Sequence, residues 1–499
     1  MITNNSPIYF VENNYESEYD LLYSLGISKE SDSFLYLIEN GYLKKNNVGK
    51  FAFDFVGLVV LDDKLVCVFP KYYINFKSEF AFKDDKYFSD FVQILKVLKK
   101  KAQNSTDEGY YNFIASDKQA NEIIIADEII QDFVSYGIYQ KDKTEQLINS
   151  EGETDWETTI NLLQPLFSKR NVIYSDTYSN NRLIEEDYII TQIHKWAVNY
   201  CIKKYSRILD YNIIFDQDSL TEILEIGSLE YLTSILQKEL NIVYLDRSIR
   251  LIKLLYNLLS KSYRKKNKGI SIYGTNTFYI IWEETCSLTF NNKRHLKICQ
   301  NISTLSKDDK EKFRDKSFLD IIPKPVWWSK DMNLSKEINS TLIPDIVSII
   351  NNTNEEEGSN LNSRIFFTLD PKYYNLEFKF NELKRSIEIG NNPGISDVTK
   401  QILYEHVFKE HLNHYFDRWY NILLFPKIDS LIEENYNTFY NVLGNVKFEL
   451  KIFKNNLVWL VYLNPKVVFE FYLNNSLSGE NSLMEIANEI DKTKIDCNY

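Results

Sequence analysis

The stretch that decides the fold covers residues 342–374 and reads LIPDIVSIINNTNEEEGSNLNSRIFFTLDPKYY. It contains an apolar run from Leu342 to Ile350, a polar loop at residues 351–362, and a second apolar run that ends at Leu369. Branched and aromatic residues favour strands, whereas a loop rich in Asn, Glu and Gly favours a turn. The pattern therefore predicts two adjacent strands that form a hairpin.

Each predicted strand carries one carboxylate, Asp345 in the first and Asp370 at the end of the second. Lys372 follows two residues later, and residues two apart on a strand point to the same face. Two carboxylates suit Mg²⁺, which keeps several waters and bridges to phosphate. A lysine ammonium beside them can orient an attacking water or help to deprotonate it. This combination is typical of a nuclease site.

The order Pro344-Asp345 followed by Asp370-Pro371-Lys372 resembles the PD-(D/E)xK nuclease signature. The resemblance implies a restriction-endonuclease-like core in which Asp345 and Asp370 bind the metal and Lys372 positions the water. Pro371 departs from the pattern, because a small residue is expected there. Proline keeps its carbonyl but lacks an N–H, so a hydrogen bond of the strand ladder is expected to be missing at that position.

Residues outside this stretch extend the resemblance to the RecB-like branch of the family. Glu283 lies upstream on a predicted helix and would be the third metal ligand, although the adjacent Glu284 is a rival for that role. Gln401 and Tyr404 lie downstream with the Gln-x-x-Tyr spacing, and the resemblance implies that they brace the site or touch the phosphate.

Three segments resemble the LlaJI-type restriction endonucleases, which are relatives of McrC subunits: Trp282-Glu283, residues 370–374 and residues 397–401. The resemblance implies the cleavage subunit of a restriction system that acts in phage defence. Its implied cofactor is Mg²⁺, with Mn²⁺ as a substitute. Its implied partners are double-stranded DNA and a separate McrB-like AAA+ subunit that hydrolyses GTP or ATP.

Other interpretations of the same residues remain. Pro-Asp is a common turn dipeptide and Asp-Pro-Lys occurs at strand ends, so either fragment alone would be structural more often than catalytic. The chain could also be a regulator that docks on an AAA+ motor and stimulates it, with a vestigial nuclease site. A third interpretation is a DNA repair nuclease without a role in restriction.

The composition limits the possible functions. The chain has 499 residues, 44% of them hydrophobic, and a net charge of −12. A protein that binds DNA unaided should carry a basic surface, because phosphate neutralisation dominates affinity. No G-x-x-x-x-G-K-[ST] motif is present, so hydrolysis of nucleotides through a P-loop is not expected from this chain.

The five cysteines are widely spaced and form no C-x-x-C pair, which fits a reducing compartment. No apolar run reaches about 18 residues, and no signal-peptide pattern is present at the N-terminus. We therefore expect a soluble cytoplasmic protein without a membrane span.

The pattern of elements predicts a multi-domain α/β (α+β) protein. We expect a β-rich N-terminal partner-docking domain at residues 1–140, a mostly helical middle domain at 150–268, and the nuclease domain with a C-terminal hairpin at 269–499. Helices are expected at these ranges: 87–101, 186–205, 220–238, 247–264 and 396–419. Hairpins are expected at 51–71, either as core or as a McrC-like entry domain, and at 446–463.

Several single features allow two readings. The basic run at residues 261–268 is either a solvated helix end or a contact to DNA phosphates. Trp327 and Trp328 can stack on a base, although packing is the favoured interpretation. His194 lies near the apolar stripe of its helix and is expected to be a packed, hydrogen-bonded histidine rather than a metal ligand.

Overall fold

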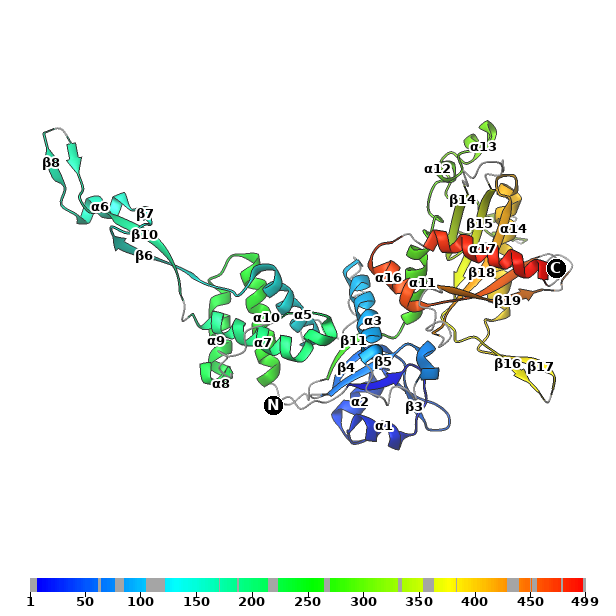
Figure 1. Ribbon diagram of the computed structural model, residues 1–499, viewed down its shortest axis with the longest axis horizontal. Helices are drawn as coiled ribbons and strands as arrows, with labels where there is room; N and C mark the ends of the chain where they lie inside the picture. The colour runs from blue at the N-terminus through cyan, green and yellow to red at the C-terminus, as the bar shows by residue number, and fades with distance from the viewer. Residues whose placement is uncertain are drawn as a thin grey trace. The chain divides into compact units, whose positions relative to one another are not determined.

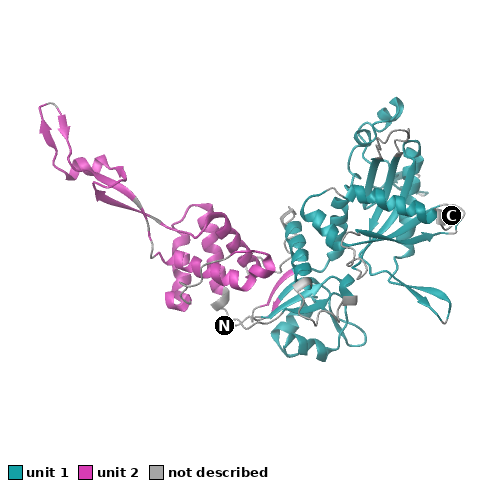
Figure 2. Ribbon diagram, in the orientation of Figure 1, with its two compact units in different colours: residues 1–59, 64–114, 274–499 teal, residues 60–63, 115–273 magenta. Residues whose placement is uncertain are grey.

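The computed structural model describes the following residues: 7–61, 64–76, 85–104, 122–169, 171–185, 188–213, 223–263, 270–330, 334–352, 363–382, 384–428, 439–448, 450, 456–476 and 479–496. They belong to two compact units (Figure 2). Unit 1 comprises residues 1–59, 64–114 and 274–499, and unit 2 comprises residues 60–63 and 115–273. Both units mix helices and strands, which confirms the predicted mixed α/β class.

Unit 1 contains a five-stranded mixed sheet in the order β14-β15-β18-β20-β19 (Figure 1). Its strands are β14 (Ile346–Asn352), β15 (Ser363–Pro371), β18 (Arg418–Pro426), β19 (Tyr440–Lys447) and β20 (Leu457–Leu463). The three central strands run parallel, and β14 and β19 run antiparallel to their neighbours. Because β14 pairs directly with β15, the predicted hairpin of adjacent strands is confirmed.

Helices cover both faces of this sheet. Phe366 and Phe367 are consecutive on β15 and so point to opposite faces. The ring of Phe366 lies 5.0 Å from that of Phe408 on α14 (Ile395–Leu412). Phe367 stacks on Tyr420, whose hydroxyl donates to Asp491 on α17 (Gly479–Asp496). Apolar side chains on both faces are what a buried parallel sheet requires.

The other elements of the C-terminal half of unit 1, residues 274–499, surround the five-stranded sheet. They are α11 (Phe278–Thr289), α12 (Ile298–Asn301), α13 (Lys307–Lys312), η3 (Asn413–Tyr415) and α16 (Pro465–Leu473). Two separate two-stranded ribbons are also present: β12 (Val326–Ser329) with β13 (Leu334–Glu337), and β16 (Glu377–Asn381) with β17 (Ser386–Gly390). The first ribbon precedes β14 in the chain, and the second follows β15.

The N-terminal half of unit 1 contains β1 (Ile8–Val11), α1 (Glu18–Leu25), α2 (Asp32–Glu39), β2 (Leu43–Lys45), β3 (Phe51–Phe53), most of β4 (Val56–Leu61), β5 (Lys64–Phe69), η1 (Lys71–Phe76) and α3 (Asp85–Asn104). Strands β1, β5 and β4 belong to a four-stranded sheet in the order β1-β5-β4-β11. Residues 270–273 of β11 (Ile270–Thr275) are counted with unit 2. Every residue of β4 is buried, so the predicted hairpin at 51–71 lies in a core. Helix α3 packs on α16, where Lys466 Nζ lies 2.8 Å from Asp90 Oδ2.

Unit 2 combines a helical cluster with a strand-built arm (Figure 1). The helices are α5 (Glu122–Tyr136), α7 (Ile189–Leu209), α8 (Ile223–Ile226), α9 (Leu229–Leu240) and α10 (Asp246–Tyr263). The arm contains β6 (Asp142–Ile148), β7 (Glu153–Thr154), α6 (Trp156–Leu162), β8 (Leu166–Ser168), β9 (Asn171–Ile173) and β10 (Tyr178–Ile184). In the arm, β10 pairs antiparallel with β6 and β7, and β8 pairs with β9.

Most predicted helices are present with shifted ends, but some boundaries are wrong. The helix expected at 396–419 ends at Leu412, because Arg418 and Trp419 belong to β18, where Asp417 N–H donates to the Arg364 carbonyl. The first strand of the C-terminal hairpin is β19, earlier than expected. Between residues 142 and 184 the chain forms strands β6 to β10 and helix α6, elements that the sequence analysis did not place. Pairing between distant segments decides these cases.

Two further expectations have outcomes. His194 is buried and its Nδ1 accepts a hydrogen bond from Tyr139 N–H at 3.0 Å, which confirms a packed histidine. The side chains of the basic run at 261–268 lie outside the described residues.

The three-domain layout with boundaries near 140, 150 and 268 stays a prediction. Among the described residues, no helix is both long enough and apolar enough to cross a lipid bilayer.

Candidate active site

The register of β14 and β15 brings the two predicted carboxylates together. Val347 pairs with Thr368, and Ile346 pairs with Leu369. The next step along this antiparallel register places Asp345, directly before β14, opposite Asp370, which is still paired with Leu423 on β18. Side chains of directly opposite residues are neighbours. Two residues separated by a long loop therefore meet because the strand pairing is in this register.

Asp370 is a buried carboxyl group. Its Oδ1 atom has no hydrogen-bond donor among the described residues. Burial raises the pKa of Asp370, and the neighbouring Asp345 carboxyl raises it further. Such a group is costly to keep ionised unless a cation lies beside it.

Lys372 supplies a cation at this place. Its Nζ lies 3.0 Å from Asp370 Oδ2 and 3.4 Å from Asp397 Oδ1. Burial alone would lower the pKa of Lys372, but the Asp370 and Asp397 carboxylates outweigh it and raise that pKa. The strand ladder continues past Pro371, because Lys372 N–H donates to the Leu424 carbonyl at 2.8 Å. The Lys372 backbone is therefore anchored to β18 although Pro371 has no N–H to donate.

Asp397 is a site residue whose role the sequence did not reveal. It lies in the first turn of α14, and its Oδ2 accepts a hydrogen bond from Gly394 N–H at 3.2 Å. Its other oxygen faces Lys372. An acidic residue in a first helical turn is usually explained by capping alone. The second role became visible only when the helix was placed beside β15.

The two candidate glutamates on α11 face different surroundings. Burial raises the pKa of Glu283 to about 7, and Asp345 raises it while Lys372 and Arg294 lower it, so Glu283 belongs to the same electrostatic cluster. Glu284 instead forms an ion pair with Lys101 and accepts a hydrogen bond from the Tyr472 hydroxyl at 2.9 Å. This geometry favours Glu283 over Glu284 as the glutamate of the site.

Gln401 and Tyr404 project from α14, and both are buried. The Tyr404 hydroxyl donates to the Ile343 carbonyl at 2.8 Å, directly before Pro344-Asp345. Burial raises the pKa of Tyr404 to about 12, and the Asp345 and Asp370 carboxylates also raise it. Neither Gln401 Nε2 nor Oε1 has a hydrogen-bond partner among the described residues. The tyrosine thus braces the Asp345 backbone, and the Gln401 amide keeps its hydrogen-bonding capacity.

A loop after α11 holds Asp345 from the other side. Arg294 Nη1 donates to the carbonyls of Pro344 and Asp345 at 3.2 and 2.9 Å, and Asn292 Nδ2 donates to the Asp345 carbonyl at 2.8 Å. Asn292 Oδ1 also accepts from Val347 N–H at 3.1 Å. No motif in the sequence pointed to these two residues. They act on backbone atoms of a segment far away in the chain.

The donor set at Asp345 and Asp370 fits a hard divalent cation. Both residues offer carboxylate oxygens, and Asp370 Oδ1 accepts no hydrogen bond from the part of the chain that the structure describes. Mg²⁺ is typically held by one or two carboxylates and completes its shell with water and phosphate. Among the described residues, no three His, Cys, Asp or Glu side chains are placed to hold a metal by themselves. The three-ligand set with Glu283 therefore stays a prediction.

We expect Asp370→Asn to stabilise the metal-free protein, and to do so more strongly at pH 8 than at pH 6. The folded-state pKa of Asp370 is raised, so its contribution to the free energy of unfolding falls as pH rises from the usual carboxyl value toward the raised one. Asparagine does not ionise and removes this loss. Thermal unfolding in EDTA at both pH values measures the effect, with the exposed Asp315→Asn as control. Equal Tm differences at pH 6 and pH 8 would contradict it.

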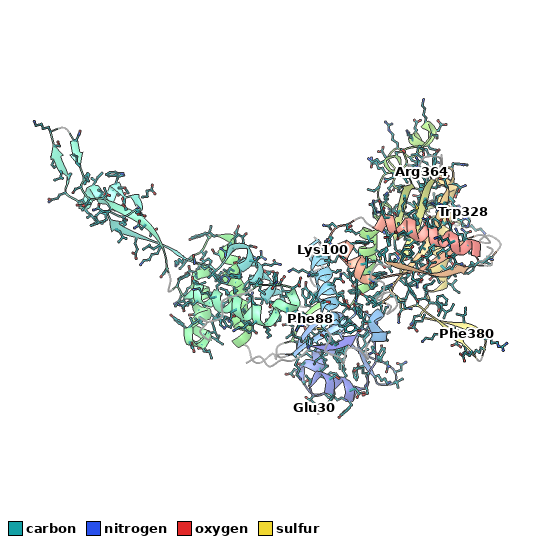
Figure 3. The ribbon with its side chains drawn as sticks, in the orientation of Figure 1. Glu30, Phe88, Lys100, Trp328, Arg364 and Phe380 are labelled. Atoms are coloured by element: carbon teal, nitrogen blue, oxygen red, sulfur yellow. The ribbon has the colours of Figure 1, made fainter. Side chains whose placement is uncertain are left out.

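The ribbon before β14 presents two tryptophans to solvent. Trp327 is 66% exposed and Trp328 is 61% exposed, so the favoured interpretation of packing is wrong (Figure 3 labels Trp328). Hydrogen bonds at the ribbon base join Ile338 N–H to the Pro325 carbonyl at 3.1 Å and Thr341 Oγ1 to the Pro323 carbonyl at 2.7 Å. The closed base lies a few residues before Asp345, so the ribbon and the carboxylate site are neighbours along the chain.

The chain is similar to known proteins over most of its length. The chain is 28% identical over 463 residues to the type II restriction enzyme BsuMI component YdjA of Bacillus subtilis (strain 168), covering 92% of this chain and 88% of that relative. A solved structure of Thermococcus gammatolerans McrB AAA+ hexamers with bound McrC aligns with 94% of this chain and 99% of its own, at 12% identity and a TM-score of 0.31.

The family model of the LlaJI restriction endonuclease matches residues 55–466, a range that includes every predicted site residue. A match over this share of the chain shows the family. This chain belongs to the LlaJI restriction endonuclease family.

Proposed function

We propose that this chain is the DNA-cleaving subunit of a restriction system, with a Mg²⁺-dependent site of the PD-(D/E)xK type. One observation carries the proposal: strand pairing brings Asp345 opposite Asp370, with Lys372 Nζ 3.0 Å from Asp370. Among the described residues Asp370 Oδ1 has no hydrogen-bond donor, so this oxygen is free to accept a cation. Buried, unbalanced charge of this kind is characteristic of functional sites.

Each residue has a defined task in this proposal. Asp345 and Asp370 would hold the cation, and Glu283 would join them or accept a proton from water. When bound, Mg²⁺ would neutralise charge on the scissile phosphate and lower the pKa of water. Lys372 orients the attacking water, and Asp397 holds the lysine in place. Tyr404 fixes the Asp345 backbone, and the Gln401 amide would donate to a phosphate oxygen.

We propose that the DNA duplex is bound in part by the β12–β13 ribbon. The major groove admits a two-stranded ribbon, and exposed aromatic rings stack on bases. The segment also carries Lys324, Lys330 and Lys336, which can contact phosphates. Its place directly before β14 puts these groups next to the carboxylate site in the chain.

We also propose that cleavage needs a nucleotide-hydrolysing AAA+ partner and takes place in the cytoplasm. This chain has no P-loop motif and a net charge of −12, which disfavours DNA binding unaided. The Bacillus subtilis relative is itself named a component of a restriction enzyme. Cys67, Cys201, Cys286 and Cys299 are free thiols, as in proteins of a reducing compartment.

The arm of unit 2 offers an apolar surface for such a partner. At its tip, Phe167 pairs with Val172, and Leu166 pairs with Ile173. All four side chains are exposed, Phe167 by 82%. Exposed apolar groups of this kind mark interaction sites. The docking role of residues 1–140 stays a prediction beside this one.

We therefore expect Phe167→Asp to reduce partner binding and partner-stimulated cleavage by about tenfold or more, since a charge at an apolar anchor is costly. The fold should be retained because the side chain is exposed. Plasmid cleavage and pull-down with and without the neighbouring ATPase or GTPase measure the effect. Tyr244→Asp, an equally exposed aromatic of unit 2, serves as control. Efficient, site-specific cleavage by this chain alone would refute the partner requirement.

A further inference from the structure

The residue after the catalytic lysine is buried in the N-terminal half of unit 1. Tyr373 is 7% exposed, and its hydroxyl donates to Glu12 Oε2. Glu12 directly follows β1 and is 5% exposed. The same Oε2 atom accepts from Lys71 N–H at 3.3 Å, and Lys71 N–H also lies 3.2 Å from the Tyr373 hydroxyl oxygen. Two segments of the N-terminal half thus converge on one hydroxyl group.

The Tyr373 ring is held as firmly as its hydroxyl. Lys71 Nζ lies 4.3 Å from the ring centroid, a cation–π distance. On another side, the ring centroid lies 5.5 Å from that of Phe278, the first residue of α11. Because α11 also carries Glu283, Tyr373 contacts the element that positions a second group of the site.

The backbone transmits this restraint to Lys372. Lys372 N–H is fixed to the Leu424 carbonyl on β18, and Tyr374 N–H donates to the Lys372 carbonyl at 2.9 Å. This last bond closes a three-residue turn with Tyr373 at its centre. A rotation of the Tyr373 backbone therefore changes the direction of the Lys372 side chain, whose Nζ must stay near Asp370 and Asp397.

We propose that Tyr373 is a positioning residue for Lys372, held by Glu12 and the Lys71 backbone, and that this contact couples the N-terminal β-sheet to the nuclease site. The inference rests on the proposed function, since it assigns the positioning of its catalytic lysine. Glu12 makes no contact with substrate or metal in this scheme. A hydrogen bond between two buried side chains has only one well-formed geometry, so it can fix a turn more sharply than packing alone.

The test compares Tyr373→Phe, Glu12→Leu and the double variant in Mg²⁺-dependent duplex cleavage, with the nucleotide-hydrolysing partner present. We expect kcat to fall about 10- to 100-fold in each single variant, because small displacements of a catalytic group have effects of this size. KM should stay within about twofold, since DNA contacts are unchanged. The double variant should be no slower than the slower single variant, as expected of two groups in one interaction. If the kcat losses of the two single variants multiply in the double variant, Tyr373 and Glu12 act independently and the proposed coupling is wrong.

Tyr72→Phe is the matched control. Tyr72 is a buried neighbour with its ring centroid 6.2 Å from that of Tyr373, but its hydroxyl has no hydrogen-bond partner among the described residues. Removing that hydroxyl tests for general loosening of the same region. A fall in kcat for Tyr72→Phe equal to that of Tyr373→Phe would overturn the specific role of the Tyr373–Glu12 bond.

A second readout does not depend on cleavage. Reductive ¹³C-methylation of lysines gives a dimethyl NMR signal for Lys372, assigned by its loss in Lys372→Arg. We expect this signal to shift in Tyr373→Phe and Glu12→Leu but not in Tyr72→Phe. An unchanged signal together with unchanged kcat overturns the inference, even if Tm falls. A shifted signal in a chain that does not cleave DNA supports the positioning role and refutes the proposed nuclease function.

Discussion

Replacing Lys372 with alanine is expected to lower DNA cleavage by about 10²- to 10⁴-fold, the range typical for the loss of a group that orients or moves a proton. The ammonium contacts two carboxylates, Asp370 and Asp397, and no other described side chain places a cation at these oxygens in an ion pair. Lys372→Arg should recover little, because a planar guanidinium cannot substitute for a compact ammonium at this position. The measurement is single-turnover cleavage of duplex DNA under saturating Mg²⁺, with the nucleotide-hydrolysing partner present.

The fold of the Lys372→Ala variant should be retained. Lys372 is partly exposed, and its backbone bond to the Leu424 carbonyl does not depend on the side chain. Lys379→Ala, on the exposed β16–β17 ribbon seven residues later, is a suitable control for a lost lysine. A well-folded Lys372→Ala protein that cuts DNA at the normal rate would show that this lysine is not catalytic.

Removal of divalent metal with EDTA is expected to abolish cleavage, and Mg²⁺ or Mn²⁺ should restore it. Ca²⁺ should fail, because its longer and more variable coordination suits an in-line displacement poorly. Binding should also raise Tm, since a cation held by Asp345 and Asp370 would offset the burial and the Asp345 charge that raise the pKa of Asp370. At a metal concentration of 100 times Kd, binding to the folded state alone should increase the free energy of unfolding by about 2.7 kcal/mol.

Asp370→Asn separates this site from general effects of salt. The variant lacks one carboxylate, so the Tm increase caused by Mg²⁺ should be lost while the protein remains folded. Asp315→Asn, whose side chain is exposed and paired with Lys297, should keep the Mg²⁺ response of the unaltered chain. Full turnover in Ca²⁺ alone, or a Mg²⁺-dependent Tm increase that survives in Asp370→Asn, would argue against these two residues as the metal site.

The sequence alone predicted the hairpin of β14 and β15 and the pair of carboxylates on it. This was possible because both strands are local, apolar and separated by a polar loop, so that their pattern follows from short-range preferences. It also predicted a Glu on α11 and a Tyr on α14 near the site, because their order along the chain matches a known nuclease pattern. The LlaJI family itself was predicted from those same residues and is confirmed.

Contacts between segments far apart in the chain could not be predicted from the sequence pattern. Asp397 serves Lys372, Arg294 and Asn292 hold the Asp345 backbone, and Tyr373 donates to Glu12 across 361 residues of chain. None of these pairs leaves a periodic or motif signal, because each depends on how helices and sheets pack. The exposed Trp327 and Trp328 were misjudged for the same reason, since exposure is decided by which neighbours the fold supplies.

The residue types of the candidate site thus follow from the sequence: two acidic groups and a lysine on predicted neighbouring strands. The sequence also lacks a P-loop motif. The tertiary structure decided which of two adjacent glutamates faces that chemistry, because the phase of α11 turns Glu283 toward Asp345 and Glu284 toward Lys101. It also brings Tyr373, the residue after Lys372, to Glu12, which directly follows strand β1. The physical reason is that strand pattern is a short-range property, whereas helix phase and burial depend on packing against residues far away in the chain.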